Sequence, residues 1–153
     1  MRPTVSEQLA GIRRILDEVI APQVTEAYPV DMLRGVLANL EMLERSWTRV
    51  VPFLAWDNEQ TAELLRDVAS VVDHGLAARI AEALAAAAVD PLDVAALDAR
   101  NTTLRELLAE AVPQLATGGE RAAPQYARVR AHLRARIDRF PFNASAPMPG
   151  ATR

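Results

Sequence analysis

The stretch DMLRGVLANLEMLERSWTRVVPFL, residues 31–54, decides the fold. Its apolar side chains recur every three or four residues, as they do along one face of a helix with 3.6 residues per turn. This stripe consists of Leu33, Val36, Leu40, Leu43, Trp47, Val50 and Leu54. The apolar side is made wider by a second set, Met32, Leu37, Met42, Val51 and Phe53. We therefore expect a central helix over this stretch, kinked or ended at Pro52.

The segment before this stretch predicts a first helix. Thr4 and Glu7 have the spacing of a capping box, in which each side chain binds a backbone N–H of the first turn. Apolar residues at helical spacing follow, and the helix is expected to end at about Ile20. Residues 21–29 are interpreted as a linker, after which Asp31 is expected to cap the central helix.

Three more helices are expected after the central one. Asp57 or Asn58 is expected to form a turn with Trp56 and to cap a third helix, which reaches about residue 84 with a possible break at Gly75. Asp93 is expected to cap a fourth helix. After a loop at residues 117–119, a fifth helix is expected over residues 123–139.

Composition favours an all-α fold. Half of the residues are hydrophobic but only 5% are aromatic, and Ala-rich runs such as residues 81–88 favour helix. The strict alternation that is typical of strands is absent. We predict a single domain over residues 1–140, an up-down bundle of four long helices plus a fifth C-terminal helix. Residues 141–153, with three prolines, predict a mobile tail.

The sequence lacks residue types on which several chemistries depend. It has no cysteine and no lysine, which excludes thiol nucleophiles, disulfides, Cys-based zinc sites and lysine Schiff bases. No Glu-x-x-His pair occurs, and no serine lies in a Gly-x-Ser-x-Gly turn. His74, two turns from Asp67, and His132, between arginines, are interpreted as surface side chains. We predict no catalytic residues, no metal site and no cofactor.

Charge is divided unequally along the chain. Residues 1–119 carry 10 arginines against 18 acidic residues, a balance of −8, whereas residues 120–153 carry 7 against 2, a balance of +5. Because the whole chain is acidic, with a pI near 5.4, no nucleic-acid partner is expected. Arg128, Arg130 and Arg134 are candidates for binding a partner protein or an anion, and a solvated helix is the alternative.

Trp47, Trp56 and Asn101 are candidates for lining a ligand pocket between helices. Asn101 falls on the apolar stripe of the expected fourth helix, where a buried amide without partners costs about 1–3 kcal/mol. It is interpreted either as a packing amide that fixes helix register or as a polar group in a pocket. Trp56, with Asp57 and Asn58, forms either a pocket rim or a lid over a helix cap.

Three segments carry a resemblance to a known family: RPTVSEQL at residues 2–9, VIAP at 19–22 and LANLEMLER at 37–45. They resemble a family of short, uncharacterised helical bacterial proteins, which tend to be encoded beside aminoglycoside-phosphotransferase-like kinases and acyl-CoA dehydrogenases. The resemblance covers about residues 3–45 and includes no catalytic motif. It implies an accessory role beside a small-molecule-modifying enzyme.

These observations favour a non-catalytic interaction or accessory protein that forms a homo-oligomer or binds a partner enzyme. The alternative is a protein that binds a small apolar, acyl-type ligand between its helices. No membrane partner is expected, because no segment approaches the ~20 apolar residues of a membrane span. The N-terminus lacks the apolar stretch of a signal peptide, so we expect a cytoplasmic protein.

Overall fold

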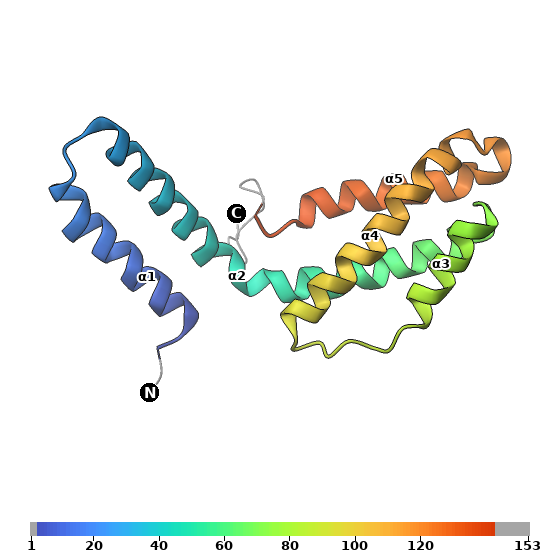
Figure 1. The fold of residues 1–153 in the computed structure, drawn as a ribbon, viewed down its shortest axis with the longest axis horizontal. Coiled ribbons are helices and arrows are strands. Elements are labelled where there is room, and N and C mark those ends of the chain that lie inside the picture. The colour runs from blue at the N-terminus through green and yellow to red at the C-terminus, as the bar shows by residue number, and fades with distance from the viewer. Residues whose placement is uncertain (1–2, 143–153) are drawn as a thin grey trace, which may run out of the picture. The chain divides into compact units, whose positions relative to one another are not determined.

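The computed structural model describes residues 3–142, and within them the chain forms five α-helices and no strand (Figure 1). The helices are α1 (Val5–Ile15), α2 (Ala27–Val68), α3 (His74–Ala85), α4 (Val94–Thr117) and α5 (Gly119–Arg139). A π-helical turn, η1 (Leu16–Ile20), and a 3-10 helix, η2 (Ala21–Gln23), follow α1. The all-α prediction is confirmed. The chain divides into two compact units, Met1–Arg49 and Val50–Arg153, which we describe separately.

The start of α1 confirms the predicted capping box, whereas the start of α2 differs from its prediction. The Thr4 hydroxyl accepts a hydrogen bond from the Glu7 backbone N–H at 3.2 Å, and the Glu7 carboxylate accepts one from the Thr4 N–H at 2.6 Å. Because α2 already begins at Ala27, the predicted cap at Asp31 is wrong. Asp31 instead pairs with Arg34 one turn later, at 3.0 Å.

The first unit is an antiparallel hairpin of α1 and the first part of α2. Trp47 Nε1 donates a hydrogen bond to Ser6 Oγ at 2.9 Å, and Arg13 Nε lies 3.3 Å from Glu44 Oε2. The paired residue numbers therefore rise along α1 while they fall along α2. Between the helices, the π-helical and 3-10 turns reverse the chain before α2 begins.

The continuity of α2 is the main correction to the predicted helices. The sequence predicts a turn and a new helix soon after Pro52, but α2 continues through this residue to Val68. Pro52 removes one backbone hydrogen bond, and the intact bonds on either side carry the helix past it. The predicted capping role of Asp57 or Asn58 is wrong, because both side chains are buried inside α2 and bind groups on other helices.

The remaining helix boundaries follow local capping chemistry. Asp73 caps α3 by accepting a hydrogen bond from the Leu76 N–H at 2.9 Å, so the break in the predicted third helix comes before Gly75. Asp93 caps α4 as predicted, with the Ala96 N–H as donor at 3.0 Å. The predicted loop at 117–119 shortens to one residue, because α5 begins at Gly119, whose φ of 61° favours glycine.

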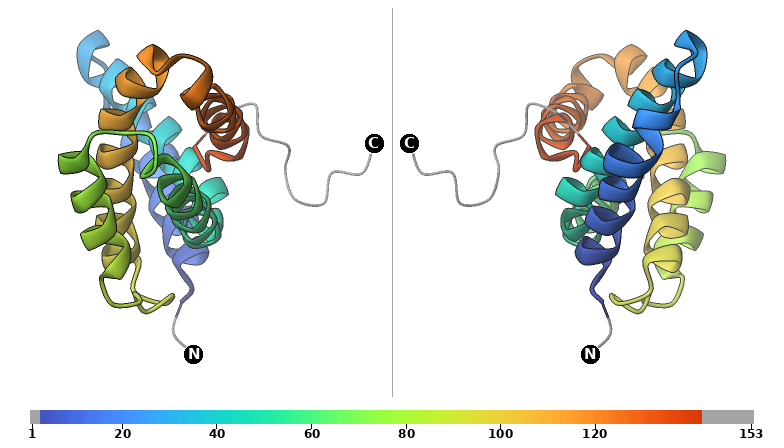
Figure 2. Two further views of the ribbon diagram at one scale, coloured as in Figure 1. Left: turned by 90° about the vertical axis from the view of Figure 1, so that its right-hand side faces the viewer. Right: turned by 90° about the vertical axis from the view of Figure 1, so that its left-hand side faces the viewer.

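The core of the second unit is built from α2, α3, α4 and α5. α4 lies alongside both α3 and α5 (Figure 2). The three helices contribute residues to one buried apolar cluster. The fully buried residues include Leu65, Val68, Ile80, Ala111 and Val129. A second, smaller group consists of Phe53, Leu54 and Leu97. These clusters contain no residue of the first unit.

The predicted tail is described only in part. Pro141, the residue after the predicted domain boundary, is buried, and Phe142 is half-buried. The ring of Phe142 lies 5.7 Å from that of Phe140 in an edge-on arrangement. Residues 143–153, most of the predicted tail, lie outside the described residues.

Replacing Leu104 with alanine tests the position of the core. Leu104 is 1% exposed, so Leu104→Ala leaves a cavity and is expected to lower the free energy of unfolding by about 3 kcal/mol. Leu92 is 84% exposed and serves as the matched control, for which Leu→Ala should change this free energy by less than about 0.5 kcal/mol. Urea denaturation followed by circular dichroism measures both, and equal effects would contradict the core.

Candidate functional site

The first unit exposes large apolar side chains and buries none. Within residues 3–49, no hydrophobic side chain is buried. Ten large ones are between 39% and 74% exposed, and they include Ile20 and Met42. We call the other eight the apolar face: Val5, Ile12, Ile15, Val19, Tyr28, Met32, Val36 and Leu43.

Helical geometry places the α1 part of the apolar face along one line. At about 100° per residue, Val5 and Ile12 lie within about 20° of each other around the axis of α1. Val19 follows in the π-helical turn. Ser6 and Arg13, which contact α2, lie roughly 110° away from this line. The line therefore runs beside the contact between the two helices and not inside it.

The α2 part of the apolar face lies on the same side of the hairpin. Met32, Val36 and Leu43 also lie within about 40° of one another around the axis of α2. The side of α2 that faces α1 carries Glu44 and Trp47. Seen along each helix from its N-terminus, the apolar residues of both helices are rotated in the same direction away from the side that faces the other helix. Two antiparallel helices are related by a two-fold axis perpendicular to the plane that contains them. This axis exchanges the two helices without exchanging the two faces of the hairpin. Apolar residues that are rotated in the same direction on both helices therefore lie on the same face.

No charged residue lies on this face. Within residues 5–49, the arc of roughly 80° that holds the apolar residues contains, besides them, only Gln8 on α1 and the small polar residues Asn39 and Ser46 on α2. Up to residue 49, every Asp, Glu and Arg of the two helices points elsewhere, such as Arg34, which pairs with Asp31, and Arg45, which pairs with Glu41. The hairpin is thus divided into one uncharged apolar face and a charged remainder.

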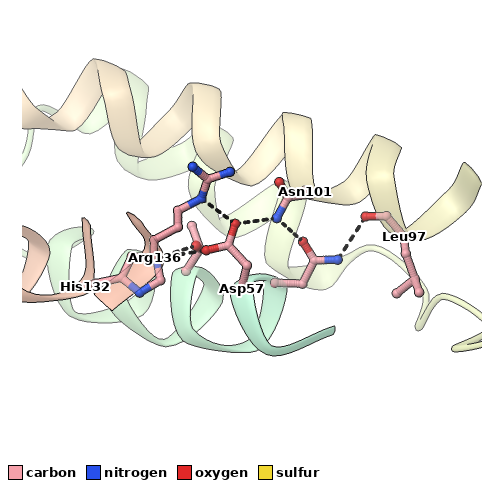
Figure 3. Close-up of polar contacts among 7 residues, drawn as sticks. Asp57, Leu97, Asn101, His132 and Arg136 are labelled. Carbon is pink, nitrogen blue, oxygen red and sulfur yellow. Dashed lines mark hydrogen bonds and ion pairs between the residues drawn. The ribbon is translucent and has the colours of Figure 1, made fainter. Parts of the chain in front are cut away.

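The second unit contains a buried polar cluster centred on Asp57 of α2 (Figure 3). Asp57 is 0% exposed. Its Oδ2 accepts hydrogen bonds from Asn101 Nδ2 of α4 and from Arg136 Nε of α5, both at 2.8 Å. Its Oδ1 lies 3.2 Å from His132 Nε2 of α5, outside hydrogen-bonding geometry. One carboxylate therefore ties three helices together.

Neighbouring side chains extend this Asp57 cluster. Asn101 Nδ2 also donates to Asn58 Oδ1 at 3.0 Å, and Asn58 Nδ2 donates to the Leu97 carbonyl at 3.0 Å. The Thr61 hydroxyl forms a hydrogen bond with His132 Nε2 at 3.2 Å. These contacts satisfy amides and hydroxyls that would be costly to bury alone.

Asp57 is held in its ionised form. Burial alone would raise the pKa of its carboxyl, but the contacts with His132, Asn101 and Arg136 outweigh burial and lower the pKa to about 2. A carboxylate that is ionised at neutral pH and enclosed by helices lacks the pKa near the working pH that general acid–base catalysis requires. The Asp57 cluster has the chemistry of a structural clamp.

The interpretation of His132 as a surface residue is wrong. His132 is 8% exposed, and its ring lies 5.4 Å from that of Trp56. The sequence shows only its neighbours on α5, Arg128 and Arg136, and these suggested a solvated cationic face. The acidic partner Asp57 is 75 positions away in the sequence, so nothing local indicates it.

The candidate pocket residues fall in different surroundings. Trp47 belongs to the first unit, where its indole binds Ser6. Trp56 and Asn101 belong to the second unit. Trp56 lines a shallow groove of about 270 Å³, and the Arg139 guanidinium lies 4.3 Å from its ring centroid. Asn101 is buried, and both acceptors of its amide N–H groups lie on α2.

The three candidate arginines do not converge. Arg128 pairs with Asp67 of α2, and the Arg130 guanidinium lies 5.8 Å from the ring centroid of Tyr126. Arg134 is exposed. Arg130 and Arg134 are about 40° apart around α5, but Arg128 is roughly 160° from Arg130. The structure therefore brings only two of them to one side of the helix.

Residues 3–142 hold no group of three or more His, Asp or Glu side chains placed to bind a metal ion. None of their helices combines the length and apolar content needed to cross a bilayer. Comparison of the chain with protein-family models, with curated proteins and with solved structures gives no significant match.

Removing the charge of Asp57 tests the clamp. Asp57→Asn keeps the shape of the side chain but leaves Arg136 without its counter-charge, and it should lower the free energy of unfolding by about 3 kcal/mol. Asp67→Asn is the control, because its ion pair with Arg128 is exposed and should contribute less than about 1 kcal/mol. Chemical denaturation measures both, and a smaller loss for Asp57→Asn than for Asp67→Asn would contradict the clamp.

Acid should remove the same stabilisation. Since the pKa of Asp57 falls from an ordinary 3.8 to about 2 on folding, its ionised form stabilises the protein fully above the ordinary value. This contribution, at most about 2 kcal/mol, is lost as the pH falls through the folded value. The difference in unfolding free energy between wild type and Asp57→Asn, measured from pH 6 down to pH 2.5, should therefore shrink. A constant difference would show that the Asp57 charge is not responsible.

Proposed function

We propose that the protein is a non-catalytic interaction module that binds another protein chain through the apolar face. The observation that carries the proposal is the hairpin of residues 3–49, which has no buried hydrophobic side chain and one uncharged apolar side. Contiguous exposed apolar surface of more than a few hundred Å² marks interaction sites in soluble proteins. A covering partner would give these side chains the burial that the hairpin lacks.

The second unit supports this role by folding around a core of its own. Its core and the Asp57 cluster give it a fixed arrangement of α3, α4, α5 and the end of α2. The up-down bundle predicted from the sequence remains a proposal for how the long helices are arranged. The accessory role beside a small-molecule-modifying enzyme, which the family resemblance implies, also remains a proposal.

Binding of a small apolar ligand is the second candidate, and one observation favours it. The groove of about 270 Å³ is lined by an aromatic and an aliphatic side chain, Trp56 and Leu64. Its volume is just below the range of about 300–1,000 Å³ that is typical of ligand pockets, and its rim includes the charged Glu63 and Arg128. These features suit an apolar ligand less well than the apolar face suits a protein.

Single-cysteine labelling tests whether the apolar face is available for binding. The chain has no cysteine, so Val36→Cys reports on the face and Ala38→Cys on the charged side of the same helix. At nanomolar concentration, both thiols should react with a polar maleimide at rates within about threefold of each other, because both positions are exposed. Strong protection of the cysteine at position 36 at this dilution would mean that the chain covers its own face, and the proposal would fail.

A further inference from the structure

The apolar face needs another layer of helices. A helix hides an apolar stripe only against a neighbouring element, and a hairpin offers each of its helices just one neighbour. The side chains of the apolar face lie beside the contact between α1 and α2, so that contact cannot cover them. Two further helices placed across this face would complete a four-helix arrangement.

We infer that these two helices come from a second copy of this chain, so that two hairpins of residues 3–49 pack face to face as a four-helix bundle. This inference rests on the proposed function and names the partner. A two-fold axis would pair the face with itself, as in the isologous interfaces of most dimers. Each helix would then have only antiparallel neighbours, which is also the favourable arrangement for helix dipoles.

The size of the face fits a dimer. With about half of each side chain exposed, its eight residues present roughly 700 Å² per chain, close to the roughly 800 Å² per partner of a standard interface. This area is that of the apolar side chains alone, and the interface would also include Gln8 and Asn39. Two copies therefore supply the area that a specific association requires.

The chemistry of the face favours a second copy over an unrelated protein. Homodimer interfaces are more apolar than those of transient complexes, which have polar rims and complementary charges. This face has no charged residue that would specify a different, oppositely charged surface. Residues 3–49 carry 5 arginines and 7 acidic residues, so two copies would repel each other only weakly.

Mass measurement over a range of concentrations tests the inference. The wild-type chain is expected to run in sedimentation equilibrium at twice 16.7 kDa when concentrated and to dissociate on dilution. In the Ile12→Glu/Val36→Glu variant, the two new charges lie in the interface, and the dimer Kd should rise at least about 100-fold. Glutamate forms helices as readily as isoleucine or valine, so the helical circular dichroism should not change.

The matched control is Ala27→Glu/Ala38→Glu. It adds the same two charges at exposed positions on the other side of α2, and its dimer Kd should stay within about threefold of the wild-type value. A wild-type chain that stays monomeric at hundreds of micromolar would overturn the inference. So would a dimer that both double variants weaken equally.

Cysteine labelling at high concentration separates this inference from the proposed function. The cysteine at position 36 should become protected as the chain dimerises, while the one at position 38 stays reactive. If the concentrated chain is monomeric and position 36 still reacts, the second copy is wrong but the face remains available for another protein. If position 36 is protected at every dilution in a monomer, both proposals are wrong.

Discussion

Two helices by themselves cannot enclose a core, and this constraint governs the hairpin of the first unit. Their mutual contact uses one side of each helix, through pairs such as Ser6 with Trp47 and Arg13 with Glu44. Within the hairpin, an apolar residue outside that side has no neighbouring helix to cover it. Because Ile12 and its neighbours in the apolar face lie there together, the hairpin by itself leaves the face uncovered.

The second unit satisfies the same constraint with its own helices. Its helices supply several neighbours for each apolar stripe, and residues such as Leu65 and Ile80 are completely buried. It also buries a carboxylate, Asp57, at the junction of three helices. Hydrophobic residues of similar volume are often at least as stabilising as a buried ion pair. The directional bonds of Asp57 to Asn101 and Arg136 instead fix how α4 and α5 are placed against α2.

Features encoded within one helical turn could be predicted from the sequence, and features that depend on distant contacts could not. The Thr4 capping box and the Asp93 cap were predicted correctly because donor and acceptor lie within three residues of each other. Asp57 has the local appearance of a cap, yet its partners lie on α4 and α5. The wide apolar side of α2 was visible in the sequence. It was not visible that Met32 and Val36 are exposed whereas Phe53 and Leu54 are buried, because exposure depends on how many helices surround each part.

The most direct measurement of the central claim is an isotope-filtered NOE experiment on an equal mixture of labelled and unlabelled chains. It detects only pairs of protons that belong to different molecules. If two copies pack face to face, methyl groups of Ile12, Val36 and Leu43 should give intermolecular NOEs, while core methyls such as those of Leu104 should give none. A concentrated sample in which the apolar face gives no intermolecular NOE would contradict the dimer.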